Sequence, residues 1–368
     1  MKFSTERDTL LKPLQAVQGV VERRHSLPIL ANVLLTVRGG LLSVLASDME
    51  LELMSSIELD AQAEGEVTVP ARKLVDICRS LPAGAAVSLS LEEDQVVVRS
   101  GRSRFSLSTL PSNEFPQSDP PSDDFRLALP QSDLKRLIEL TAFAMAHQDV
   151  RYYLNGLLLE IDEKLLRAVA TDGHRLALAE VAINGGPSGS TRQIILPRKG
   201  VTELQRLLGS DDAVDLVVGS NAIRMTVGNT RFTSKLIDGR FPDYTRVIPD
   251  VNSTEKEIRV DREALRQCLA RAAILSNDKY RAVRLCLEPG RLRVLANNPE
   301  QEAAEDEVEV DYDGDGLEIG FNVTYMIDAL SAVPSSEARL CLTDSSSSCL
   351  ILPSEGSACQ YVVMPMRL

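Results

Sequence analysis

The sequence lacks any long hydrophobic run. No apolar stretch approaches the roughly 18 residues that a membrane-spanning helix needs. The first residues, MKFSTERD, are mostly polar and do not provide the hydrophobic core of a secretion signal. We therefore expect a cytoplasmic protein without a membrane partner.

Motifs for nucleotide hydrolysis, metal binding and disulfide formation are also missing. There is no glycine-rich P-loop, and the six cysteines are scattered without a CxxC pair. We expect free, mostly buried thiols, as is usual in a reducing compartment. The run DYDGDG (311–316) opens like a calcium-binding loop, but its twelfth position is Asn322, where such a loop needs a bidentate glutamate. We interpret the run as a turn and predict neither a metal nor a cofactor.

Residues suited to catalysis are equally sparse. The chain has only three histidines, and one of them, His174, lies in the run TDGHR (171–175). A hydrolytic triad needs a nucleophile, a base and an orienting group that converge in space, and no G-x-S-x-G motif accompanies this run. We predict that the protein is not an enzyme. A hydrolase centred on His174 is an alternative that would require His174 substitutions to abolish turnover of a substrate.

Basic residues are in the minority, yet they are unevenly distributed. The chain has 40 Lys and Arg against 53 Asp and Glu, for a net charge of −13, which argues against a generally basic nucleic-acid binder. Lys and Arg concentrate in segments with helical periodicity, whereas acidic runs lie in predicted strands and loops. These acidic runs are 64–66, 92–94, 122–124 and 302–315. The pattern predicts basic helices that face a polyanion; solvated helix faces with ordinary ion pairs are the alternative.

Three segments of the chain share one pattern: a strand, a tight turn, a second strand and a polar corner. The segments are 28–53, 152–178 and 280–303. Their corners fall at Asp48, Asp172 and Asn298, in steps of 124 and 126 residues. A second series, of helices that begin at Pro70, at Pro197 and near Phe321, has steps of 127 and 124. Two independent series with the same period predict three repeats of about 123 residues, which we bound at 1–122, 123–250 and 251–368.

Each repeat is predicted to open with an amphipathic helix and to contain a second helix among strands and hairpins. In the first repeat, Thr5 and Asp8 have the spacing of a capping box, and Pro13 predicts a kink or a late helix start. Residues 361–365 (YVVMP) close the third repeat as the counterpart of Phe115-Pro116 and Phe241-Pro242. The fold class is α+β, with two helices on antiparallel sheets in every repeat.

The first and last repeats have edges of opposite charge. Residues 96–108 carry Arg99, Arg102 and Arg104, whereas residues 299–309 are rich in glutamate. Unpaired sheet edges are normally covered or charged, so each run could simply protect its own edge. If the edges instead pair between two chains, the head-to-tail contact closes into a ring of six repeats.

The chain closely resembles the bacterial DNA polymerase III beta subunit family, the sliding clamps. The resemblance spans the whole chain in blocks that include LPILANVLL, VPARKLVDICRSLP, SGRSRFSLSTLP, AHQDVRYYLNG, TDGHRLA, FTSKLIDGRFPDY, ANNPEQE and YVVMPMRL. It implies three clamp-type domains in a head-to-tail homodimeric ring, with basic helices around sequence-independent double-stranded DNA. It also implies that the protein is a processivity factor for DNA replication. The alternative is a peptide-binding scaffold that does not encircle DNA, which oligomeric state would distinguish.

The resemblance further implies an apolar groove between repeats two and three that binds short motifs of the replicative polymerase, the clamp loader and repair proteins. From the second repeat its walls are Leu154, Thr171, Gly173, His174, Arg175, Leu176, Pro242, Arg246 and Val247. From the third they are Asn322, Tyr325, Ser346, Ser348, Val362, Val363, Met364, Pro365, Met366 and Arg367. At Ser346 the family carries an aliphatic residue, so this chain departs from the pattern there.

Two further sets of residues follow from the same resemblance. DNA contacts are expected at Arg24, Arg72, Gln148, Tyr152, Tyr153, Arg198 and Lys199. The subunit interface is expected at Arg102, Arg104, Phe105, Leu107, Ile274, Leu275, Glu300, Glu302 and Glu305.

Overall fold

The computed structural model describes residues 1–22, 27–118, 125–189, 191–209, 212–356 and 359–367. Arg24, one of the expected DNA contacts, lies outside these residues. The chain falls into two compact units, one formed by 1–135 with 199–236 and the other by 136–198 with 237–368. Helix α3 (Gln131–Thr141) crosses the boundary between residues 135 and 136, so its two halves belong to different units.

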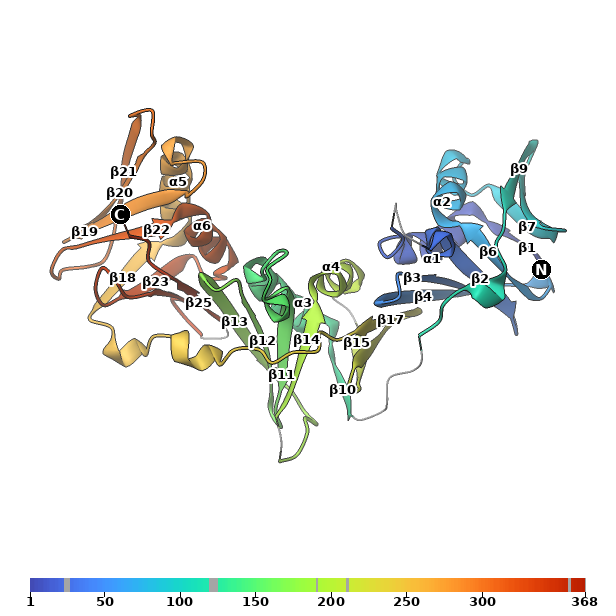
Figure 1. Cartoon of the computed structure of the whole chain (residues 1–368), viewed down its shortest axis with the longest axis horizontal. Coiled ribbons are helices and arrows are strands. Elements are labelled where there is room, and N and C mark those ends of the chain that lie inside the picture. The colour runs from blue at the N-terminus through green and yellow to red at the C-terminus, as the bar shows by residue number, and fades with distance from the viewer. Residues whose placement is uncertain (23–26, 119–124, 190, 210–211, 357–358, 368) are drawn as a thin grey trace. The chain divides into compact units, whose positions relative to one another are not determined.

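The first unit contains two antiparallel sheets. The smaller sheet has the strand order β5 (Ala61–Ala63), β1 (Lys2–Glu6), β7 (Ala86–Glu92), β8 (Gln95–Ser100) and β9 (Ser103–Ser108). The larger has the order β10 (Phe125–Pro130), β15 (Ala213–Val218), β16 (Ala222–Val227), β17 (Thr230–Lys235), β4 (Leu51–Glu58), β3 (Leu41–Ser47), β2 (Asn32–Arg38) and β6 (Gly65–Pro70). Helix α1 (Arg7–Val17) packs on β3, β4 and α2 (Ala71–Ser80), as Figure 1 shows. Helix α4 (Arg198–Leu207) belongs almost entirely to this unit.

The second unit repeats this plan. Its larger sheet has the order β14 (Arg192–Pro197), β11 (Gly156–Ile161), β12 (Leu165–Thr171), β13 (Arg175–Ala182), β25 (Cys359–Val363), β24 (Cys349–Pro353), β23 (Glu337–Leu342) and β18 (Lys256–Asp261). The smaller sheet has the order β21 (Ala303–Glu309), β20 (Arg291–Asn297), β19 (Ala282–Glu288) and β22 (Leu317–Asn322). Helices α5 (Arg262–Ala272) and α6 (Val323–Ala332) pack against each other, and α5 also contacts β20 and β21.

Both large sheets join strands from successive repeats. In the first unit β17 pairs with β4, which places Phe232 opposite Leu53. In the second unit β25 pairs with β13, which places Tyr361 opposite Ala177. We call these two pairings the repeat joints. The aromatic residue at each joint is fully buried, so the joints bury core side chains and also complete a hydrogen-bond ladder.

The start of each repeat differs from the prediction. A strand comes first (β1, β10 or β18), and the helix follows. Thr5 therefore lies in β1, paired with Val87, and the helix cap is Glu6, which makes no side-chain capping bond. The capping-box prediction was wrong because Thr5 is held in the strand ladder, while the Asp8 carboxylate instead accepts a hydrogen bond from the Gly84 N–H at 2.8 Å. Helix α1 continues through Pro13.

The predicted starts of two helices and the burial of the cysteines are confirmed. Helices α2 and α4 begin directly after Pro70 and Pro197. All six cysteines are buried free thiols, and burial raises the pKa of Cys78 to about 11. In the DYDGDG run the Tyr312 hydroxyl donates to the Asp315 carbonyl at 2.7 Å. Within the described ranges no His, Cys, Asp or Glu side chains group as metal ligands, and no helix has the length and apolar character to cross a membrane.

Candidate functional site

An apolar pocket of about 200 Å³ lies in the second unit. Nine of the residues expected in the groove line it: Leu154, Thr171, Gly173, Arg175, Leu176, Pro242, Val247, Val362 and Met364. Four residues that were not assigned to the groove also line it: Arg151, Tyr153, Asp243 and Tyr244. We call this cavity the apolar pocket. Its floor belongs to a buried cluster that includes Leu154, Leu176 and Val362, so its walls are fixed by core packing.

One wall of the apolar pocket is formed by the connecting segment 237–250. This segment runs beside β11, β12 and β13 (Figure 1). Phe241 and Tyr244 are buried in the same cluster as the pocket floor. The Tyr244 hydroxyl donates to Glu160 at 2.8 Å, and burial raises the pKa of this phenol. The segment is therefore anchored by both apolar packing and a buried hydrogen bond.

The corner after β12 shapes the opposite wall. Gly173 has φ +89°, a left-handed conformation that favours glycine. A side chain there would also collide with the Arg151 guanidinium, whose nitrogen lies 2.8 Å from the position of a Cβ. Arg151 in turn is held by Asp149 at 2.8 Å and by the Asp172 carbonyl at 3.0 Å. Its hydrogen bonds lower the pKa of Asp149 to about 2, so this ion pair persists at all neutral and mildly acidic pH values.

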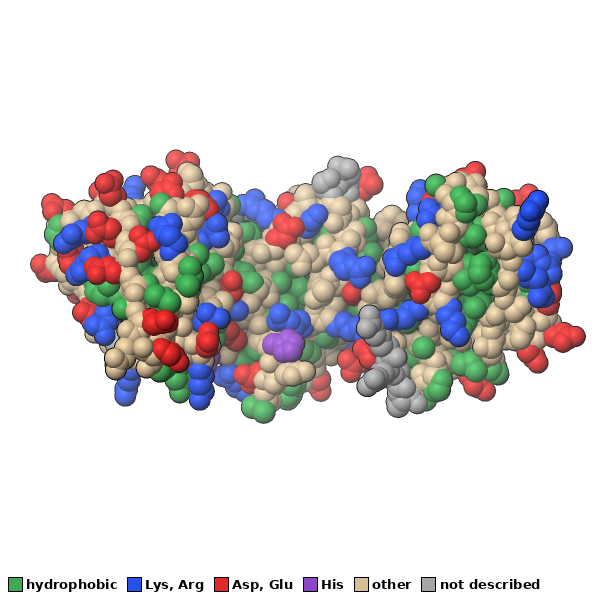
Figure 2. Space-filling model, turned by 90° about the horizontal axis from the view of Figure 1, so that it is seen from above, with side chains coloured by type: hydrophobic (Ala, Val, Ile, Leu, Met, Phe, Trp, Pro, Cys, Tyr) green, Lys and Arg blue, Asp and Glu red, His purple; other side chains and the backbone are tan. Residues whose placement is uncertain are grey.

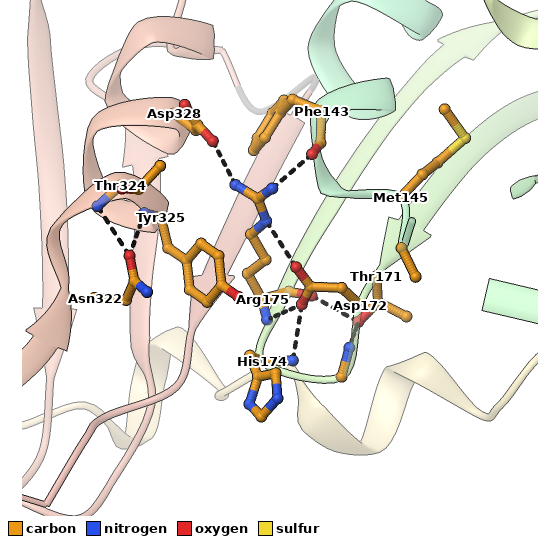
Figure 3. A network of polar contacts seen from close by, with 12 residues as sticks. Phe143, Met145, Thr171, Asp172, His174, Arg175, Asn322, Thr324, Tyr325 and Asp328 are labelled. Atoms are coloured by element: carbon orange, nitrogen blue, oxygen red, sulfur yellow. Dashed lines mark hydrogen bonds and ion pairs between the residues drawn. The ribbon is translucent and has the colours of Figure 1, made fainter. Parts of the chain in front are cut away.

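Arg175 is the polar hub beside the pocket, as Figure 3 shows. Its guanidinium donates to Asp172 at 3.0 Å, to Asp328 on α6 at 2.6 Å and to the Phe143 carbonyl at 2.7 Å. The guanidinium carbon also lies 4.5 Å from the centroid of the Tyr325 ring, within the range of a cation–π interaction. Because three N–H groups are already engaged, Arg175 acts as a rigid wall of the pocket.

Replacing Arg175 by Met should lower the free energy of unfolding by about 1–3 kcal/mol, because the partly buried acceptors lose their donor. Denaturant unfolding measures the effect. Arg246→Met is the control, at the residue that precedes the pocket residue Val247: its side chain is 82% exposed and, among the described residues, pairs with Asp243 alone, so its loss should cost about 0–1 kcal/mol. Equal losses in the two variants would contradict the assignment of Arg175 as a structural hub.

The C-terminal residues extend the site. The Met364 N–H donates to the His174 carbonyl at 2.9 Å, and the Met366 N–H donates to the Gly320 carbonyl at 2.8 Å. A second cavity, of about 660 Å³, lies beside this tail and is more polar. Its lining residues are Glu318, Ile319, Gly320, Ser345, Ser346, Pro365, Met366 and Arg367. The Ser346 hydroxyl donates to Asp344 at 2.8 Å. The serine that stands here in place of an aliphatic residue therefore takes part in a local turn.

Six of the expected groove residues line neither cavity: His174, Arg246, Asn322, Tyr325, Ser348 and Val363. Asn322 caps α6 by accepting the Thr324 N–H at 2.9 Å, and Val363 is buried within β25. Of the residues that the sequence reasoning missed, Asp243 and Tyr244 follow Pro242 in the same FPDY run, and Arg151 precedes Tyr152. Adjacency to expected residues was the signal that could have found them.

The expected DNA contacts fall into two groups. Arg72 and Gln148 are exposed, and Tyr152 is 56% exposed with its ring edge-on to Tyr153 at 5.7 Å. Arg198 and Lys199 are instead engaged within the fold: Arg198 donates to the Met145 and Ala146 carbonyls, and Lys199 pairs with Glu22 and Asp48.

Basic residues of α5 are also paired with acidic ones. Arg266 lies 2.6 Å from Glu263, and Arg271 lies 2.6 Å from Asp306. Figure 2 shows basic and acidic side chains interspersed over the visible face. Local ion pairs, which were the alternative explanation for basic helices, are therefore present. They make the unpaired positive charge on the helices smaller than the count of Lys and Arg indicates.

Two sheet edges of opposite charge are left unpaired in the described chain. Strand β9 is the last strand of the five-stranded sheet, and β21 is the first strand of the four-stranded sheet. Arg102 and Arg104 are exposed at β9, and Glu300, Glu302 and Glu305 are exposed at or beside β21. Next to β21, Ile274 is 77% exposed. Phe105 and Leu275 are half-buried, whereas Leu107 is buried.

Comparison with known proteins matches three family models in succession. They describe the N-terminal, central and C-terminal domains of the DNA polymerase III beta subunit, and they cover residues 1–119, 128–243 and 245–367. The chain belongs to the DNA polymerase III beta subunit family. Beta sliding clamps of Pseudomonas putida and Escherichia coli are each 52% identical to it over the full length of both chains.

Solved structures agree with this assignment. The DNA polymerase III subunit beta of Pseudomonas aeruginosa covers all of both chains with 51% identity and a TM-score of 0.96. A sliding clamp of the same species bound to griselimycin matches with 52% identity and a TM-score of 0.96. The function of the chain is that of a processivity clamp in DNA replication, which acts together with DNA and a DNA polymerase and catalyses no reaction.

Proposed function

We propose that two chains close head to tail into a ring of six repeats that encircles duplex DNA. The observation that carries this proposal is the pair of repeat joints. Strand β9 is equivalent to β17 and β25, the strands that form the joints, and it is the only one of the three that is unpaired on that side among the described residues. Likewise β21 is equivalent to β4 and β13. A second chain supplies the missing partner for each edge. The same type of joint then connects every pair of neighbouring repeats in the ring, within each chain and between the two chains.

The two internal joints give the register of the proposed contact. Leu53, Ala177 and Ala304 are equivalent residues of the three repeats. Each pairs with the equivalent alanine of the preceding strand, namely Ala46, Ala170 and Ala296. Leu53 and Ala177 face Phe232 and Tyr361 across the joints. Phe105 is the equivalent of Phe232, since each is the fourth residue after a hairpin glycine. Phe105 should therefore face Ala304 of the second chain, and Arg104 should face Glu305.

Charge at these edges supports the same register. In the single chain Arg104 lies 3.5 Å from Glu92, and Glu305 lies 3.1 Å from Arg293. Both pairs are exposed, and exposed pairs contribute only about 0–1 kcal/mol each. They can therefore exchange for a pair between Arg104 and Glu305 at little cost, and the Arg102, Glu300 and Glu302 charges add to the attraction.

The ring needs only weak, sequence-independent attraction to DNA, because its hold is topological and the DNA must slide. Arg72, Gln148 and Tyr152 are the proposed contacts with an exposed surface. The half-buried Tyr153 is a further proposed contact, and so is Arg24, which lies outside the described residues. We assign Lys199 and Arg198 a supporting role, since their charged groups are already engaged within the fold. These partners place the proposed ring in the cytoplasm, where replication takes place.

We further propose that the apolar pocket and the tail Met364–Arg367 bind short motifs of the polymerase, the clamp loader and repair proteins, and that griselimycin occupies the same pocket. Adaptable methionines and aliphatic walls suit different apolar anchors. The exposed Arg246 suits a polar or acidic end of an extended segment. The repeat boundaries after residues 122 and 250 remain a prediction.

Retention on DNA tests the ring. The protein is loaded by its loader onto a nicked plasmid, half of the sample is linearised, and bound protein is followed at moderate salt. We expect the protein to remain on circles and to leave linear DNA by its ends. Equal loss from both forms would mean ordinary electrostatic binding, and the ring would then give way to a peptide-binding scaffold that does not encircle DNA.

A further inference from the structure

Three buried polar atoms without a hydrogen-bond partner come together on β16 and β17. They are the Nε atoms of Arg224 and Arg231 and the hydroxyl of Thr233. Thr233 is only 3% exposed, and both arginines are half-buried. The large majority of buried side-chain polar atoms in proteins have a partner, so three such atoms in one place call for a physical reason.

The three side chains share one face of the sheet. Arg224 pairs directly with Thr233 across the two strands, and Arg231 lies two residues before Thr233 on the same strand, so all three point the same way. The Arg231 guanidinium lies 3.3 Å from the Met54 sulfur, on the neighbouring strand β4. Directly opposed side chains have Cβ atoms about 4.5–5.5 Å apart and diagonal neighbours about 7–8 Å. One small group can therefore contact all three.

The charge at this cluster is unbalanced. Burial and the nearby charge of Arg231 lower the pKa of Arg224. Glu52, opposite Thr233, is 5% exposed. Its carboxylate accepts the Ser118 N–H at 2.9 Å, and its charge partly offsets these effects on Arg224, so two guanidinium groups and one carboxylate leave a net positive charge. The described residues provide no ion pair to Arg224 or Arg231. Two partly desolvated guanidinium groups therefore lie side by side, and the described residues leave the Nε–H donor of each one without a partner.

The equivalent face of the second unit contains the apolar pocket. There the pairs Leu350–Val362 and Val362–Leu176 occupy the positions of Arg224–Thr233 and Thr233–Glu52. The same place in the fold is thus apolar at one repeat joint and cationic with hydroxyl donors at the other. The cationic face in the first unit does not suit an apolar anchor, whereas it suits an anion.

We propose that Arg224, Arg231 and Thr233 form an oxyanion-binding site that accepts a phosphate or carboxylate group. The Nε–H groups and the Thr233 hydroxyl would donate to its oxygens, and the guanidinium charges would be neutralised by it. Planar guanidinium groups are well suited to this geometry. The site is independent of the proposed groove and of the DNA contacts.

Inorganic phosphate is the first probe, measured by isothermal titration calorimetry at constant ionic strength with chloride as the reference. Wild-type protein should bind it with a stoichiometry of one per chain, and the double variant R224M/R231M should lose this binding. T233V, which places in this sheet the residue found at position 362, should weaken it severalfold. The control variant R259M/R291M removes two exposed arginines of the second unit and should bind as the wild type does.

Stability without phosphate gives a second measurement. Replacing partly desolvated, unpaired charges with apolar side chains is often neutral or stabilising, so R224M/R231M should melt at the same temperature as the wild type or higher, and phosphate should no longer raise that temperature. Absence of phosphate binding to the wild type, or equal binding to R224M/R231M, would overturn the proposal. A hexa-aspartate peptide that competes with phosphate would identify the ligand as an acidic protein segment, and a peptide that does not compete would identify it as a small anion.

Discussion

A chain carrying Ile274→Asp should be monomeric at concentrations at which the wild type is a dimer. Ile274 is 77% exposed in the single chain and lies beside the free edge of β21, where the proposed register places the β9 edge of a second chain. Burying an isoleucine contributes about 1.5–3 kcal/mol. The ring contains two such contacts, so the loss is about 3–6 kcal/mol, or roughly 10²–10⁴-fold in the dimer dissociation constant. Desolvation of the new carboxylate adds to this.

Sedimentation equilibrium measures the effect, and the plasmid assay should show loss of retention on circular DNA in the same variant. Leu41→Asp is the matched control, since Leu41 is a 44% exposed aliphatic residue of β3, a strand that is paired on both sides within its sheet. It should remain dimeric. A dimeric Ile274→Asp protein would rule out the proposed contact between β9 and β21.

Val247→Asp should abolish binding to the apolar pocket while leaving the dimer intact. Val247 is 40% exposed and lines the pocket, so a carboxylate there would have to be desolvated by any apolar anchor. Lost apolar contact of about 1.5–3 kcal/mol, together with this desolvation, predicts that affinity for griselimycin falls by at least about 100-fold. Surface plasmon resonance with immobilised protein provides the measurement.

Val251→Asp is the control for this prediction. Val251 is 36% exposed and lies four residues after Val247, just beyond the connecting segment, but it lines neither cavity. Its affinity should be unchanged. Deletion of residues 364–368 should resemble Val247→Asp, because β25 ends at Val363 and keeps its ladder. If the deletion unfolds the second unit instead, the tail is primarily structural.

Hydrophobic periodicity and internal repetition predicted the α+β class, the three repeats and the second helix of each repeat. They failed at the start of each repeat, where Thr5 and its equivalents enter a strand before the helix. The reason is tertiary: β1 is held between β5 and β7, and these partners come from residues far along the chain. A capping pattern is local in the sequence, so it cannot predict that Thr5 pairs in a sheet instead of capping the helix.

The groove was predicted only in part, because its walls come from four separate stretches of chain. Leu154, Leu176 and Val362 could be named from the resemblance, but the contribution of Tyr244 depends on its hydrogen bond to Glu160. The ion pair of Lys199 could not be predicted for a similar reason. Its sequence position indicates a free cation, while the fold brings Asp48, 151 residues away, against it.

The sequence by itself determined the repeated unit, because strand and helix periods and glycine or proline positions are local properties of the chain. It also determined the opposite charges of the two terminal edges. Only the tertiary structure decided which strands of successive repeats pair, since pairing depends on packing of residues that are far apart in sequence. For the same reason, it alone revealed that one repeat joint has an apolar pocket and the other a pair of arginines without an ion-pair partner among the described residues.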